Sequence, residues 1–260
     1  MENKYILSVG TLSHGGLIVV KVFESLGQKV HFFDSFVSAK LIKFVLRKKS
    51  MGIITLRSYP MLLFFKETIY FQNMNVLYGN DYKSIIHRLL TRIFRFNKRH
   101  VCQSKEVEKK LKEKFPFLRT ETENFIPQYI NFLQKNIKIS LEVKLYDCCA
   151  ITSDVVHRRN ELINEVLKRK RLPKFLQIGG KKIITSYSDV VFFNKLSHQE
   201  TIKELSKAKS LLITSEFETV FLPLIEAIFL KIKIIFLGQD FVRKILNELE
   251  YSDYEIINLK

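Results

Sequence analysis

Short apolar runs alternate along the chain with stretches that place apolar residues at helical spacing. The chain opens with an apolar run at 4–9, a turn rich in glycine, a helical stretch at Leu17–Leu26 that stops at Gly27, and a second apolar run at 28–33. A strand, a helix and a strand within about 30 residues form a βαβ unit, whose strands pair in parallel. The pattern therefore predicts an α/β fold of the Rossmann-like type.

The alternation continues in two blocks, separated by a less regular segment at 116–143 that contains Pro116 and Pro127. We interpret this segment as a linker and expect two Rossmann-like domains, at 1–137 and 138–260, with mainly parallel sheets facing each other across a cleft. In the first block the expected helices are 40–49, 61–68, 82–95 and 104–114, and the expected strands are 52–56, 75–78 and 99–103. In the second block the expected strands are 148–152, 175–178, 189–193, 210–214, 233–237 and 254–259, and the expected helices are 154–170, 198–208, 222–230 and 241–251. The expected N-caps are Ser104, Asp154 and Ser197.

The composition is that of a globular protein. Of the 260 residues, 47% are hydrophobic and 27% are charged, which is enough apolar material for a sizeable core and excludes intrinsic disorder. The adjacent residues Cys148 and Cys149 begin a predicted buried strand, and three cysteines suit no disulfide framework, so we expect a reducing, cytoplasmic location. No leader sequence is evident, and no apolar run reaches the roughly 20 residues of a spanning helix.

The charge is strongly positive: 43 Lys and Arg stand against 26 Asp and Glu, a net charge of +17. Such a surplus favours nucleic acid, anionic lipid or a phosphorylated ligand as partner, although it also serves solubility alone. The predicted helix at 82–95 carries a dense group of positive charges. Its residues Lys83, Arg88, Arg92 and Arg95 lie beside or opposite an apolar stripe that runs from Ile85 to Phe94. This is the composition of a helix resting on an anionic membrane, and equally that of a core-facing helix with a solvated basic face.

The most informative stretch for chemistry is Ser215–Ala227. Glu218 and Glu226 are separated by seven residues, and Pro223 stands where a helix begins. The free N–H groups of a helix N-terminus bind anions, and a carboxylate within the helix accepts hydrogen bonds from a ribose diol. The stretch therefore suits a nucleoside diphosphate at the carboxyl edge of a parallel sheet.

The same stretch resembles the signature of retaining GT-B glycosyltransferases, especially glycosyltransferase family 4. The residues that match that signature are Ser215, Glu218, Leu222, Pro223, Glu226 and Ala227. The resemblance implies that Glu218 is a catalytic residue near the donor sugar and that Glu226 lies near the nucleotide ribose. It also implies that the backbone at Val220, Phe221 and Leu222 holds the diphosphate.

A glycine pair near the N-terminus follows the family's order as well. Gly15 and Gly16 resemble its first glycine loop, which implies close approach of the backbone to donor phosphate or acceptor. The surrounding residues match neither a P-loop nor the GxGxxG fingerprint of dinucleotide-binding proteins.

Three departures from the family pattern bear on the site. Of the two cations that clamp the diphosphate in the family, one is missing or displaced here; Arg158 and Arg159 are the donor-binding candidates, and solvated helix charge is the other interpretation. Thr219 and Phe221 replace the signature's glycines, so Phe221 narrows the room above the phosphate. The family's histidine has Asp81 as its nearest match, either as a catalytic residue or as a helix N-cap.

The resemblance as a whole implies a hexosyltransferase that uses a UDP- or GDP-linked sugar as co-substrate, retains the anomeric configuration and needs no metal or other cofactor. It implies a glycan or lipid-linked acceptor, as in cell-envelope polysaccharide synthesis, at the inner face of the membrane. No DxD, HExxH or CxxC motif suggests a metal site, and the family's closing C-terminal helix has no counterpart before Lys260. The alternatives are a non-catalytic GT-B-like protein that binds a sugar nucleotide or a partner, and a nucleic-acid-binding protein, for which no known motif is present.

Overall fold

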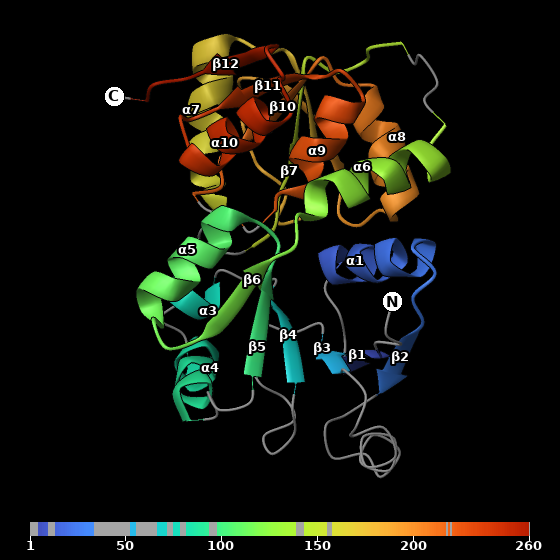
Figure 1. Ribbon diagram of the computed structural model, residues 1–260. Coiled ribbons are helices and arrows are strands. Elements are labelled where there is room, and N and C mark those ends of the chain that lie inside the picture. The colour runs from blue at the N-terminus through green and yellow to red at the C-terminus, as the bar shows by residue number, and fades with distance from the viewer. Residues whose placement is uncertain are drawn as a thin grey trace. The chain divides into compact units, whose positions relative to one another are not determined.

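The chain forms two compact units, residues 1–132 and 133–260 (Figure 1). The computed structural model describes residues 5–9, 14–33, 53–55, 67–71, 75–78, 82–93, 98–138, 143–154, 158–216, 218 and 220–259.

The first unit is built on a six-stranded sheet in the order β2-β1-β3-β4-β5-β6, in which every neighbouring pair is parallel. Its strands are β1 (Tyr5–Val9), β2 (Val30–Phe33), β3 (Ile53–Thr55), β4 (Glu67–Phe71), β5 (Lys98–Cys102) and β6 (Arg119–Thr122). Its helices are α1 (His14–Ser25), α3 (Asn75–Tyr78), α4 (Tyr82–Ile93) and α5 (Lys105–Lys114). The predicted N-cap of α5 is confirmed, because the Val107 N–H donates to Ser104 Oγ at 3.3 Å.

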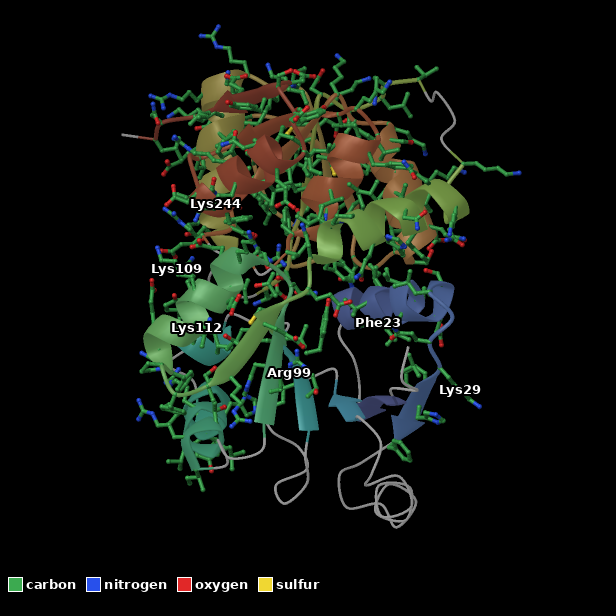
Figure 2. All side chains as sticks on the ribbon, viewed as in Figure 1. Phe23, Lys29, Arg99, Lys109, Lys112 and Lys244 are labelled. Atoms are coloured by element: carbon green, nitrogen blue, oxygen red, sulfur yellow. The ribbon has the colours of Figure 1, made fainter. Side chains whose placement is uncertain are left out.

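The core of the first unit lies where α1 meets the sheet. Val22 and Phe23 of α1 are buried, and Figure 2 marks Phe23 on this helix. The Phe23 ring packs edge-on against Tyr70 of β4, with 5.3 Å between the ring centres. The apolar side of the predicted helix at 17–26 therefore faces the sheet, as its spacing requires.

The second unit is built on another six-stranded parallel sheet, in the order β12-β11-β10-β7-β8-β9. Its strands are β7 (Cys148–Ile151), β8 (Lys174–Ile178), β9 (Asp189–Phe193), β10 (Ser210–Ile213), β11 (Lys233–Phe236) and β12 (Tyr254–Ile256). Its helices are α7 (Glu161–Lys170), α8 (His198–Ser206), α9 (Leu222–Phe229) and α10 (Asp240–Glu248), while α6 (Phe125–Asn136) spans the division between the units. The two parallel sheets confirm the predicted α/β fold class.

The central strands of the second unit are buried on both faces, as parallel strands between helices are. Cys148 and Cys149 are completely buried, which confirms that the pair belongs to the core. Cys148 packs in one cluster with Ile163 of α7 and Phe175 of β8. Burial raises the pKa of the Cys148 thiol to about 12, so this thiol stays protonated and unreactive.

Two predictions for the first block are wrong. Residues 75–78 form the short helix α3 instead of a strand, because a run of four residues cannot distinguish the two by its periodicity. The predicted helix at 61–68 is contradicted at its end, where residues 67 and 68 belong to β4. Its earlier residues, and the predicted helix at 40–49, lie outside the described residues.

The predicted irregular linker at 116–143 is also wrong, because it contains β6 and α6. Pro127 is the third residue of α6, within the first turn, where its missing N–H costs nothing. The two compact units divide between 132 and 133, inside α6, whereas the boundary expected from the sequence falls between 137 and 138.

Candidate functional site

The sheet of the second unit has a topological switch point at β7. The chain adds β8 and β9 on one side of β7 and then crosses over to add β10, β11 and β12 on the other. The loops that follow β7 and β10 therefore leave adjacent strands at the same sheet edge, and open parallel sheets bind ligands at this point. Arg158 follows β7 and Glu218 follows β10, so the topology brings these two predicted site residues together.

Arg158 contacts several residues that follow β10. Its Nη1 lies 3.0 Å from Glu218 Oε1 and donates to Ser215 Oγ at 3.2 Å. Its guanidinium carbon lies 5.0 Å from the centre of the Phe221 ring, a cation–π contact. Its backbone carbonyl accepts a hydrogen bond from Thr214 Oγ1 at 2.6 Å. We name Arg158, Ser215, Glu218 and Phe221 the arginine cluster.

The neighbouring arginine is placed differently. Arg159 has a left-handed backbone with φ of 50° and leads into α7, and in the described part of the chain no hydrogen bond or ion pair joins its side chain to the arginine cluster. α7 begins at Glu161 after the N-cap residue Asn160. The predicted helix at 154–170 therefore starts too early. Asp154 is not its N-cap and instead accepts a hydrogen bond from the Lys181 N–H at 2.8 Å.

The N-terminus of α9 is the second component of the site. Phe221 is the N-cap residue, without a side-chain capping bond, and Pro223 follows in the first turn. The Phe221 ring is buried and packs edge-on against Phe241 of α10, with 6.4 Å between ring centres. The guanidinium of Arg158 thus lies against the ring of the residue that caps the N-terminus of α9, where the helix carries partial positive charge.

Glu226 lies one turn further into α9 and is 2% exposed. Its Oε1 is 2.9 Å from His198 Nε2, the side chain of the first residue of α8. The capping box of Ser197 and Glu200 fixes that first turn of α8, which confirms Ser197 as the N-cap. A buried carboxylate requires a polar partner, and His198 supplies one. The ribose contact of Glu226 stays a prediction.

A rigid turn borders the switch point after β8. The fully buried amide of Gln177 donates to Thr152 Oγ1 at 3.1 Å and to the Lys181 carbonyl at 2.8 Å. Gly179 has φ of 81°, and a Cβ there would lie 2.6 Å from the Thr152 carbonyl oxygen, so only glycine fits. No sequence signal distinguishes Gln177 from an ordinary strand residue, because its partners come from another strand and from the following turn.

In the first unit, the glycine pair occupies a helix instead of the predicted loop. α1 begins at His14, so Gly15 and Gly16 belong to its first turn, after the carboxyl end of β1. β1 lies between β2 and β3 and forms the switch point of this sheet. Asp81, Arg95 and the side chain of Lys83 lie outside the described residues.

The apolar stripe predicted for the basic helix does not face the core as a unit. Ser84 and Thr91 of α4 are buried, Ile86 and Leu90 are half-buried, and Arg92 is exposed. On α4, the described apolar residues that are at least half exposed are Tyr82, Ile85, Leu89 and Ile93. Arg88 is half-buried, and the Arg92 guanidinium carbon lies 6.0 Å from the centre of the Phe115 ring. We name Tyr82, Ile85, Leu89 and Ile93 the α4 apolar ridge.

Neither a metal centre nor a spanning helix is found in the portion of the chain that the structure describes. No group of three or more His, Cys, Asp or Glu residues there is placed to hold a metal ion. Every helix there is too short or too polar to cross a membrane.

The fold is that of the GT-B glycosyltransferases. Among solved structures, WaaG, a glycosyltransferase involved in lipopolysaccharide biosynthesis, aligns over 98% of this chain and 85% of its own, with a TM-score of 0.61 and 10% identity. The DNA-modifying enzyme β-glucosyltransferase, solved with and without uridine diphosphoglucose, aligns over 96% of this chain and 89% of its own, with a TM-score of 0.60 and 13% identity.

An enzyme of another class has the same architecture. UDP-N-acetylglucosamine 2-epimerase from Rickettsia bellii aligns over 91% of this chain and 79% of its own, with a TM-score of 0.54 and 12% identity. No protein-family model and no curated protein matches the chain. At these identities the likeness concerns the fold, so the chemistry must be argued from the site.

Proposed function

We propose that the protein is a glycosyltransferase that moves a sugar from a UDP- or GDP-linked donor to a glycan or lipid-linked acceptor. The observation that carries this proposal is the arginine cluster at the switch point of a GT-B fold, beside the N-terminus of α9. A guanidinium close to a helix N-terminus suits a diphosphate.

The reaction needs charge stabilisation more than covalent help from the protein. As the bond between the sugar's anomeric carbon and the phosphate oxygen breaks, negative charge develops on the leaving diphosphate. In this proposal Arg158 and the α9 N-terminus stabilise that charge, so the transfer needs no metal ion. The acceptor oxygen bonds to the anomeric carbon on the face from which the diphosphate departs, which gives retention of configuration. The proton of the acceptor hydroxyl passes to the departing phosphate. In this scheme Glu218 accepts hydrogen bonds from the donor sugar, and Glu226 from the ribose.

The acceptor side is proposed from the first unit, where Gly15 and Gly16 lie at the switch point and the α4 apolar ridge is exposed. An exposed apolar ridge with Arg92 beside it, on a chain of net charge +17, suits an anionic membrane surface. This supports a lipid-linked acceptor at the inner face of the membrane and a part in cell-envelope polysaccharide synthesis.

Non-catalytic binding of a sugar nucleotide is the second candidate function. It is favoured by Phe221, which stands where the family signature has glycine, and by the single arginine found in place of two clamping cations. Both functions use the same site, but only the first releases nucleotide in the presence of an acceptor.

The two candidates are separated by measuring nucleotide released from UDP- and GDP-sugars, with and without lipid-linked and glycan acceptors. Glycosyl transfer predicts release that depends on the acceptor, together with a higher melting temperature in UDP or GDP. A thermal shift without release supports non-catalytic binding. Neither shift nor release contradicts both candidates.

A further inference from the structure

The guanidinium of Arg158 already holds an anionic group. Glu218 Oε1 lies 3.0 Å from its Nη1, and the two side chains are only 14% and 21% exposed. A carboxylate offers a guanidinium two oxygens in much the same arrangement as a phosphate does. Glu218 therefore occupies the place at Arg158 that the diphosphate of a donor would take.

The carboxylate and a diphosphate cannot share that place at low cost. Like charges a few ångströms apart repel each other strongly at the effective dielectric of a protein surface. Because both side chains are mostly shielded from solvent, water and salt screen this repulsion only in part. A bound diphosphate therefore favours the departure of Glu218 from Arg158.

Arg158 has contacts that do not involve Glu218. Arg158 is held by the Thr214 hydroxyl at its carbonyl and by the buried ring of Phe221 beneath its guanidinium. These contacts can therefore keep the arginine in place when the diphosphate replaces the carboxylate.

We propose that the diphosphate of the donor replaces Glu218 at Arg158, and that this exchange releases the Glu218 carboxylate toward the donor sugar. The inference rests on the proposed function and adds an order of events to it. Binding of the phosphates at Arg158 thus also completes the sugar site, and the ion pair of Arg158 and Glu218 is its inactive arrangement.

Isothermal titration calorimetry with UDP, GDP and inorganic pyrophosphate tests the exchange. Removing the competing carboxylate in E218Q is expected to tighten binding about tenfold, the equivalent of about 1.4 kcal/mol. The matched control is E216Q, which removes the same charge from an exposed residue of the same connection and is expected to change affinity by less than about twofold. The double variant R158Q/E218Q is expected to bind no more tightly than R158Q, because the gain requires the freed guanidinium.

Three results would overturn the exchange: E218Q binds no more tightly than E216Q, the gain persists without Arg158, or none of the three ligands binds any variant. Turnover in the same preparations separates this inference from the proposed function. Acceptor-dependent transfer without a gain in E218Q contradicts the exchange alone. The expected affinities without transfer to any acceptor contradict glycosyl transfer alone. If both hold, E218Q lowers kcat while it lowers KM for the donor, a split that a merely structural role would not produce.

Discussion

Arg158 and Arg159 are adjacent in the sequence and carry the same charge, yet the fold gives them different environments. The loop after β7 brings Arg158 against Ser215 and Glu218, whereas Arg159 turns with a positive φ into α7. The choice between the two arginines that the sequence leaves open is thus decided by the fold, in which Arg158 contacts residues that follow β10 and Arg159 leads into α7.

This difference gives a prediction at the residue scale. R158Q is expected to lower the rate of nucleotide release about 100-fold, because it removes a charged donor aimed at the leaving diphosphate. R159Q, the matched control, is expected to stay within about threefold of the wild type, since its side chain is not joined to the arginine cluster. Steady-state kinetics with UDP-sugar measure both. Equal losses in the two variants would refute the assignment of Arg158.

The pair of His198 and Glu226 shows what a sequence does not reveal at this scale. The spacing of Glu218 and Glu226 is visible in the chain, but the partner of Glu226 comes from the start of another helix. Ser197 predicts where α8 begins, but nothing in its sequence predicts which side chain its first residue meets. Contacts between distant segments depend on strand order, which local patterns do not encode.

At the scale of the elements, one carboxylate of α5 accepts hydrogen bonds from the edge strand β6. Glu108 accepts hydrogen bonds from Thr120 Oγ1 at 2.7 Å and from Thr122 Oγ1 at 2.5 Å, and it pairs with Lys112, labelled in Figure 2, at 2.8 Å. The bonds to Lys112, Thr122 and Thr120 lower the pKa of Glu108 from 4.5 to about 2.

The pKa shift predicts a stability that depends on pH. Because the pKa is lower in the folded state, the contribution of Glu108 is fully present above about pH 4.5 and is lost as the pH falls toward 2. E108Q is expected to lower the free energy of unfolding by about 1–2 kcal/mol at neutral pH, and by progressively less in acid. Urea unfolding from pH 7 to pH 3 measures this, with exposed Glu113 of the same helix changed to Gln as the control. A deficit that stays constant over this pH range would be evidence against the assignment.

The α4 apolar ridge carries the second prediction at this scale. The double variant I85S/L89S is expected to reduce flotation with anionic liposomes about tenfold at low salt, because it removes apolar area from the contact with lipid. Both residues are exposed, so the melting temperature should change little. L26S, at another exposed leucine of the same unit, is the control. Equal flotation of the wild type, I85S/L89S and L26S would show that α4 does not contact the membrane.

Elements are predictable from this sequence where one local signal decides them. All six strands of the second unit are expected from short apolar runs, and the central ones need no alternation because they are buried on both faces. Ser104 and Ser197 predict two helix starts because a cap is a local hydrogen bond. The signal fails at α3 and α6, where a very short helix resembles a strand and a proline in the first turn of a helix resembles a break.

For the whole molecule, the fold class is predictable from the sequence and the site only in part. Two series of alternating strands and helices require two parallel sheets, and a parallel sheet that grows to both sides of its first strand has a switch point. Once the structure supplies the strand order, this switch point places Arg158 near Glu218. The sequence does not predict the ion pair of Arg158 and Glu218, which depends on side-chain packing around Phe221.

The central claim is that the arginine cluster is the diphosphate site of a nucleotide-sugar donor. A crystal structure of the protein with UDP tests it most directly. We expect the diphosphate within hydrogen-bonding distance of the Arg158 guanidinium and the α9 N-terminus, with Glu218 displaced from the arginine. UDP bound elsewhere, with the pair of Arg158 and Glu218 intact, would contradict the claim.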